Sequence, residues 1–207
     1  MTKSTWRHLP AQALDLFELQ LRARELDLFQ RYLGELAAWS ARVNLLAACS
    51  EKEVIERHLL DSLAGVRFLR GSQGVADFGA GAGFPGIPIA VVAAGTRIHL
   101  IESRRKRCSF LRHVVRTLRL DNVRVWEQRG EEWAPDEAID VAIGRGLRAD
   151  VLAVLSRRIL TPRGRLLVMR KQEAREVRLD GFAESTRLGY RLPGGEKHEI
   201  AAFDRTS

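Results

Sequence analysis

The sequence has few of the features that mark membrane proteins, secreted proteins or metalloproteins. Its longest apolar run, Ile87 to Ala94, contains a proline and is far too short to span a bilayer. No apolar stretch follows the first basic residues, so no secretory signal is expected. The two cysteines, Cys49 and Cys108, show neither metal-ligand spacing nor a disulfide framework. We therefore expect a soluble cytoplasmic protein without a metal site.

Charge is abundant and unevenly distributed. The chain of 207 residues has a formal charge of +8, and residues 97–129 hold ten Lys or Arg against three Asp or Glu. Residues 130–156 reverse this balance, with two against six. Such clustering is typical of proteins that bind a polyanion. A solvated, arginine-rich surface would give the same composition, so charge indicates a nucleic-acid partner without proving one.

Hydrophobic spacing before residue 70 is helical throughout. Ser50-Glu51-Lys52-Glu53 has the pattern of a capping box that opens one of these helices. The apolar stripes are expected at Leu14, Phe17 and Leu21, at Leu28, Tyr32, Leu36 and Trp39, and at Val54, Ile55, Leu59 and Leu63. We therefore expect residues 1–70 to form a helical N-terminal cap.

After residue 70, short β-rich segments alternate with amphipathic helices. Strands are predicted at 75–78, 97–101, 123–126, 139–143 and 165–169, and helices from about 85, over 104–118 and over 150–160. Segments 190–192 and 199–203 are expected to form a closing hairpin. This alternation is typical of βαβ units, so we expect residues 71–207 to form a Rossmann-like α/β domain with a mostly parallel, seven-stranded sheet.

The most specific motif is the glycine-rich segment 77–86, Asp-Phe-Gly-Ala-Gly-Ala-Gly-Phe-Pro-Gly, after the first predicted strand. Its alternating glycines let a ligand approach the backbone at the carboxyl edge of a parallel sheet. Gly81, Gly83 and Gly86 match the dinucleotide fingerprint, with Glu102 placed to bind a ribose. The spacing from Asp77 to Gly83 also matches methyltransferases that use S-adenosylmethionine. A carboxylate at Asp77 suits that cationic ligand better than a pyrophosphate, so the loop favours the methyltransferase and leaves an NAD-dependent oxidoreductase open.

Several motifs resemble one family. The segment 81–88, Gly-Ala-Gly-Phe-Pro-Gly-Ile-Pro, resembles the signature of the bacterial small-subunit rRNA guanine-N7 methyltransferases, formerly called glucose-inhibited division protein B. The resemblance covers roughly residues 30–172. Its other motifs, in order along the chain, are Asn44-Leu45, Arg57-His58-x-x-Asp61-Ser62-Leu63, Glu102-Ser103, Phe110-Leu111, Asn122-Val123, Arg129-Gly130-Glu131-Glu132 and Arg145. Two positions depart from the family pattern: Gly146 stands where alanine is usual, and Arg170, followed by Lys171, replaces a lysine.

The resemblance implies a class I S-adenosylmethionine-dependent methyltransferase with a helical N-terminal extension. Its partner would be 16S rRNA, in the small ribosomal subunit or an assembly intermediate. The loop and the resemblance together assign the cofactor to Asp77, Gly79, Gly81, Phe84, Glu102, Gly130, Glu131 and Arg145. The resemblance also assigns the reacting centre to Arg145, His58 and Asn44.

The implied chemistry needs few catalytic groups. Guanine N7 carries a lone pair and no proton at neutral pH, so in-line attack on a sulfonium methyl needs positioning rather than a general base. Residues 143–146, Ile-Gly-Arg-Gly, lack the Asn/Asp-Pro-Pro-Tyr/Phe motif used on exocyclic amino groups. Arginine suits guanine O6 and phosphate because its planar fork can bind either bidentately. We expect RNA contacts from Arg129, Arg105, Arg112, Arg116, Arg170 and Lys171. An RNA-binding protein with a decayed cofactor site stays a further alternative.

Overall fold

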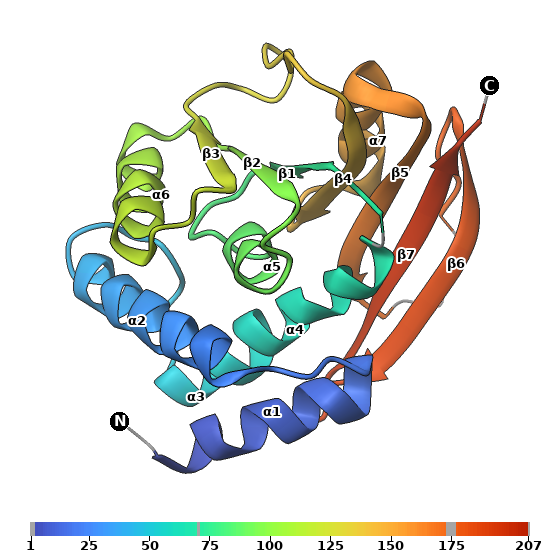
Figure 1. The fold of residues 1–207 in the computed structure, drawn as a ribbon. Coiled ribbons are helices and arrows are strands. Elements are labelled where there is room, and N and C mark those ends of the chain that lie inside the picture. The colour runs from blue at the N-terminus through green and yellow to red at the C-terminus, as the bar shows by residue number, and fades with distance from the viewer. Residues whose placement is uncertain (1–2, 70, 173–176, 207) are drawn as a thin grey trace.

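The computed structural model describes residues 3–69, 71–172 and 177–206, and a seven-stranded sheet lies at its centre (Figure 1). The strand order is β3-β2-β1-β4-β5-β7-β6, in which the first five are parallel and β7 and β6 are antiparallel to their neighbours. The strands are β1 (Gly74–Phe78), β2 (Arg97–Ile101), β3 (Val123–Trp126), β4 (Ile139–Arg145), β5 (Leu160–Lys171), β6 (Phe182–Arg191) and β7 (Lys197–Arg205). The predicted class I arrangement is confirmed.

Helices cover both faces of this sheet. One face packs against α1 (Lys3–Phe17), α2 (Ala23–Ser40), α4 (Leu60–Leu63), α5 (Gly86–Val92) and α6 (Arg105–Leu118), whose buried side chains form one hydrophobic core with it. The other face packs against α7 (Ala149–Ile159) and the fully buried Trp133. The described residues contain no helix long and apolar enough to cross a membrane.

The N-terminal helices follow the predicted spacing with two exceptions, Leu14 and Leu21, of which Leu21 is buried but lies between α1 and α2 rather than on a helix. Leu9, Ala13 and Phe17 form the buried face of α1, whereas Leu14 is 52% exposed. The prediction that Leu14 belongs to the buried stripe is therefore wrong, because a face repeating every four residues excludes its neighbour. The cap and the sheet share one hydrophobic core. The division into residues 1–70 and 71–207 stays a prediction.

The predicted capping box is confirmed, but the helix that it opens is not regular. The Ser50 hydroxyl accepts a hydrogen bond from the Glu53 N–H at 3.2 Å, and the Glu53 carboxylate accepts one from the Ser50 N–H at 2.8 Å. After α3 (Glu51–Glu53) the chain continues as a π-helix over Val54–Leu59, then α4 and a 3₁₀ turn over Ala64–Phe68. Single π turns are frequent at functional sites, and this one carries His58.

Candidate functional site

The glycine loop between β1 and α5 has a shape that side chains would not allow. Gly79, Gly81 and Gly83 have φ values of 70°, 57° and 99°, a region that favours glycine. A Cβ atom at Gly83 would lie 2.7 Å from Ile87 Cγ1 and 3.0 Å from the Tyr32 hydroxyl. A side chain at Gly83 would therefore displace the loop or its neighbours.

Tyr32 of α2 joins the N-terminal cap to this loop. Its hydroxyl donates a buried hydrogen bond to the backbone oxygen of Ala82 at 2.6 Å, and its ring lies 5.3 Å from the ring of Phe84. Burial raises the pKa of Tyr32 well above its ordinary value, so the phenol keeps its proton and donates. The cap thus helps to position the predicted cofactor loop.

Asp77 lies beneath the loop. It is fully buried, and its Oδ2 accepts a hydrogen bond from the Gly86 N–H at 2.9 Å, while Oδ1 has no hydrogen-bond partner. Burial raises the pKa of Asp77 to about 7. Asp77 lines neither of the cavities described below, and its contact with the cofactor stays a prediction. In the structure it holds the turn that leads into α5.

Glu102 follows β2 and faces the glycine loop. Its side chain is almost fully buried, and its two oxygens accept hydrogen bonds from the Gly81 N–H at 3.0 Å and the Arg104 N–H at 2.8 Å. The Arg107 guanidinium lies 3.7 Å away. Gly81 therefore acts through its backbone, by fixing the orientation of the predicted ribose-binding carboxylate.

A cavity of about 140 Å³ lies at the carboxyl edge of β1 and β2, and we call it the cofactor cavity. Gly79, Glu102, Gly130 and Glu131, all predicted to bind the cofactor, line it together. Its apolar wall is formed by Phe78, Ile101, Leu147, Val151 and Leu155. Apolar walls with a few polar groups are typical of small-molecule sites. Carboxylates for ribose hydroxyls and an apolar wall for adenine fit the adenosine half of S-adenosylmethionine.

Arg145, at the carboxyl end of β4, is the centre of a second cluster. Val141 and Ile143 of this strand pack in the core that contains α5, so alternation points Arg145 to the same face. Its Nη1 donates to Asp61 Oδ2 at 3.2 Å, and its Nη2 lies 2.8 Å from His58 Nδ1.

Phe84 of the glycine loop belongs to the same cluster. The guanidinium carbon of Arg145 lies 5.5 Å from the centre of the Phe84 ring, within reach of a cation–π contact. The His58 ring lies 5.5 Å from the same ring. The structure thus brings together three predicted site residues, Arg145, His58 and Phe84, although Phe84 does not line the cofactor cavity.

His58 is neutral at pH 7. Burial and the adjacent Arg145 charge lower its pKa to about 4. Because a guanidinium only donates, Nδ1 of His58 must accept from Arg145, and the ring proton must lie on Nε2. His58 therefore offers an N–H donor, and its one acceptor nitrogen is occupied.

The C-terminal hairpin contributes two residues that sequence reasoning missed. Asp61 is buried, and its Oδ1 accepts hydrogen bonds from the Tyr190 hydroxyl of β6 at 2.6 Å and from His198 Nδ1 of β7 at 2.9 Å. Burial raises the pKa of Asp61, but the bond from His198, the charge of Arg145 and the bond from Tyr190 outweigh it and lower the pKa overall. The hairpin therefore holds the carboxylate that anchors Arg145.

A groove of about 810 Å³ opens beside this cluster, and we call it the acceptor groove. Arg145, His58, Arg170 and Lys171 line it. Two predicted RNA-binding residues therefore share a surface with the predicted reacting centre. Arg170 is bound to the buried Glu199 at 2.7 Å.

Glu196 joins the two sides of the acceptor groove. Its carboxylate binds the Arg57 guanidinium through two hydrogen bonds, of 3.0 and 2.6 Å, and the Lys171 ammonium at 2.8 Å. These cations lower the pKa of Glu196 to about 2. The groove thus combines a fixed carboxylate with several cations.

Asn44 is not brought to the reacting centre. It is exposed and lines a separate hollow between α2 and α3 with Leu36 and Val54. Residues 47–49 line both this hollow and the acceptor groove and so stand between them.

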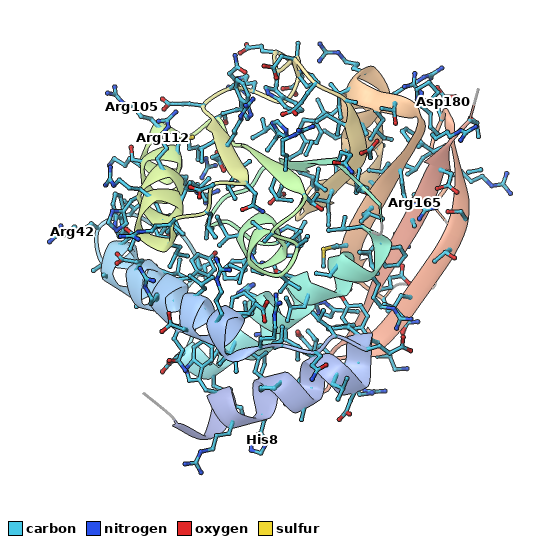
Figure 2. The ribbon with its side chains drawn as sticks, in the orientation of Figure 1. His8, Arg42, Arg105, Arg112, Arg165 and Asp180 are labelled. Atoms are coloured by element: carbon cyan, nitrogen blue, oxygen red, sulfur yellow. The ribbon has the colours of Figure 1, made fainter. Side chains whose placement is uncertain are left out.

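The other predicted RNA contacts lie outside the acceptor groove. Arg129 lines the cofactor cavity. Arg105 and Arg112 project outward from α6 (Figure 2), and Arg116 lies exposed on the same helix. Arg112 is paired with Glu127 at 2.7 Å.

No group of three or more His, Cys, Asp or Glu residues that could hold a metal occurs in the described part of the chain. The expected lack of a metal stays a prediction. Cys108 is fully buried, as expected for a core residue, and Cys49 is exposed.

Relatives and solved structures support the same family and fold. The family model "rRNA small subunit methyltransferase G" matches residues 25–189. The protein of that name from Chromobacterium violaceum is 34% identical over 195 residues, covering 91% of this chain and 93% of the relative. The one from Xanthomonas axonopodis pv. citri is 39% identical and covers 74% of both chains.

The structural relatives are more distant. A SAM-dependent methyltransferase from Aquifex aeolicus matches with a TM-score of 0.55 at 15% identity, covering 73% of this chain and 92% of that one. A Burkholderia thailandensis N1-methyltransferase, solved with bound S-adenosylhomocysteine, matches with a TM-score of 0.59 at 14% identity, covering 91% and 93%. These matches confirm the fold, and the family match excludes the NAD-dependent oxidoreductase. This chain belongs to the rRNA small subunit methyltransferase G family and is an S-adenosylmethionine-dependent methyltransferase.

Proposed function

We propose that this enzyme methylates N7 of a guanine in 16S rRNA, the family's guanine 527. Its substrate is the small ribosomal subunit or an assembly intermediate, and its place of action is the cytoplasm. The names of the relatives support the rRNA substrate. The observation that carries the choice of N7 is the state of the two groups that contact Arg145 and could act as bases, Asp61 and His58, because both are already engaged.

The two candidate bases that contact Arg145 are Asp61 and His58, and both are already engaged. Asp61 accepts hydrogen bonds from Arg145, Tyr190 and His198. His58 is neutral, but its acceptor nitrogen faces Arg145. An acceptor hydroxyl or amino group would have to lose a proton during methylation, whereas guanine N7 has none to lose. The cluster therefore suits attack by N7.

The residues of the cofactor cavity and those of the acceptor groove have separate roles. Glu102, Gly130 and the apolar wall of the cofactor cavity hold the cofactor. The bound cofactor supplies a sulfonium methyl, whose transfer leaves a thioether and places the positive charge on the guanine ring. Arg145 is held so that its fork can bind guanine O6 or a flanking phosphate. A neutral His58 adds an N–H donor without a second cation that would oppose the new charge.

The basic residues around these cavities bind the RNA backbone. Arg170 and Lys171 lie in the acceptor groove, and Arg129 lies at the cofactor cavity. Arg105 and Arg112, which project outward from α6 in Figure 2, and the exposed Arg116 on the same helix add a further basic face. A guanine must leave its stack to reach a cavity between these surfaces, so partial base extrusion is part of the proposal.

The test is methyl transfer from labelled S-adenosylmethionine to small subunits prepared from cells that lack the modification. We expect stoichiometric labelling at one guanine, located by nuclease mapping, and no labelling of fully modified subunits. Arg145→Lys retains the charge but not the fork, and should reduce single-turnover transfer about a hundredfold. Efficient transfer by this variant would contradict the assigned role of Arg145.

A further inference from the structure

Among the described residues, Leu147 alone lines both the cofactor cavity and the acceptor groove. It follows Arg145 and Gly146 in the turn between β4 and α7, and its side chain is one of the few large apolar ones that are exposed. Its Cδ1 and Cγ atoms lie 3.6 Å from where a Cβ of Gly79 would be, so it packs on the first glycine of the loop. The Leu147 side chain thus forms part of the wall of both the cofactor cavity and the acceptor groove.

The backbone before Leu147 has a conformation that favours glycine. Gly146 has a φ of 81°, and a Cβ built there would meet no atom within 4 Å. The open space shows that glycine is not needed here for close packing. Glycine is favoured at this position because it readily adopts a left-handed backbone conformation, and that conformation forms the turn that places Leu147 over Gly79.

This wall lies where the reaction needs an opening. Methyl transfer requires the reacting atoms to approach to about 3–3.5 Å, which leaves no room for a side chain between them. The cofactor cavity, about 140 Å³, is also well below the roughly 300–1,000 Å³ usual for small-molecule sites. Displacing Leu147 would both enlarge the cavity and join it to the groove.

We infer that Leu147 is the gate residue of this methyltransferase: its side chain divides the cofactor cavity from the acceptor groove and leaves that position when the cofactor binds. The inference rests on the proposed function only in taking the groove as the acceptor site. It assigns to Leu147 a positioning role and not a chemical one.

The test is the affinity for S-adenosylhomocysteine, measured by isothermal titration calorimetry without RNA. Leu147→Ala should bind at least as tightly as wild type, because the methyl side chain leaves the cavity open and displacement is no longer required. Leu147→Trp should bind about tenfold more weakly or worse, because the larger side chain fills the cavity. Val154→Ala and Val154→Trp are matched controls, since Val154 is 66% exposed on α7 and lines neither cavity; both should bind as wild type.

Two results would overturn the inference. Equal affinity of wild type, Leu147→Ala and Leu147→Trp would show that the cofactor does not meet this side chain. A tenfold loss in Leu147→Ala would show a fixed wall that holds the ligand rather than a gate. Thermal unfolding of each variant checks that the fold is intact, which the exposure of Leu147 leads us to expect. Because no RNA is present, failure to methylate small subunits would overturn the proposed function without changing this result.

Discussion

Asp61 offers the sharpest test of how the C-terminal hairpin supports the reacting centre. In Asp61→Asn the amide oxygen can still accept from Tyr190 and His198, but the new NH₂ group faces Arg145, donor against donor. Removing one partner of a buried ion pair costs about 3–5 kcal/mol. Arg145 keeps its contact with His58 and its side chain is 19% exposed. We therefore expect the free energy of unfolding to fall by an amount near the low end of this range, about 3 kcal/mol.

Urea unfolding at pH 7 measures this loss, and Asp204→Asn is the matched control. Asp204 also pairs with an arginine, Arg165, at 2.7 Å, but their side chains are 45% and 37% exposed. An exposed pair of this kind contributes about 0–1 kcal/mol. Equal losses in the two variants would refute the view that Asp61 anchors Arg145 in a buried network.

The pH dependence of Asp61→Asn has a definite sign. The pKa of Asp61 is lowered in the folded protein, so its contribution is present above its ordinary value of 3.8 and disappears as the pH falls through the folded value. The difference between wild type and variant should therefore shrink in acid. A difference that grows below pH 4 would contradict the direction of the shift.

Three further predictions concern other parts of the site. His58 has a folded pKa of about 4 against an ordinary 6.5, so it contributes stability above pH 6.5 that is lost as the pH falls towards 4. The free energy of unfolding in urea should therefore fall more for wild type than for His58→Gln over that window. A difference between the two proteins that stays constant with pH would contradict this. Glu102→Ala removes the carboxylate that binds Gly81 and faces the cofactor cavity, and should weaken S-adenosylhomocysteine binding by about a hundredfold in calorimetry. An unchanged affinity would show that Glu102 does not bind the cofactor. Arg105→Gln with Arg116→Gln should lower the salt dependence of small-subunit binding by about one to two in log–log slope. The control, Arg163→Gln, is exposed near the start of β5 and should leave the slope unchanged; equal slopes in all three proteins would exclude α6 from the RNA interface.

Local patterns were sufficient for the parallel part of the fold. Period-two and helical spacing predicted the five parallel strands and the helices beside them, because apolar alternation is a local property. The closing hairpin was expected only over 190–192 and 199–203, whereas β6 spans Phe182–Arg191 and β7 spans Lys197–Arg205. The glycine loop was also recognisable from the local sequence, since its φ values demand glycine at fixed positions. Glu102 was placed by its distance from this loop, about twenty residues, where a ribose-binding carboxylate belongs. Gly130 was assigned by the family resemblance alone.

The support of the reacting centre could not be predicted in this way. Tyr190 and His198 reach Asp61 across 129 and 137 residues, and their segments carry no motif that signals a buried hydrogen bond. Asp77 was assigned to the ligand because its type suits a cation; the structure buries it beneath the loop, which residue type alone does not indicate, and the assignment stays a prediction. Leu147 gave no signal at all, because its role depends on two cavities that exist only in the folded chain.

The central claim is that this enzyme methylates guanine N7 without a general base. Mass spectrometry of nucleosides from small-subunit rRNA, labelled by the purified enzyme, tests it most directly. We predict that the label is recovered as 7-methylguanosine, from one site, and that the single-turnover rate is flat between about pH 6 and 9 because no proton leaves the acceptor. Label on an exocyclic amino group or a ribose hydroxyl, with a rate that rises with pH, would contradict the account.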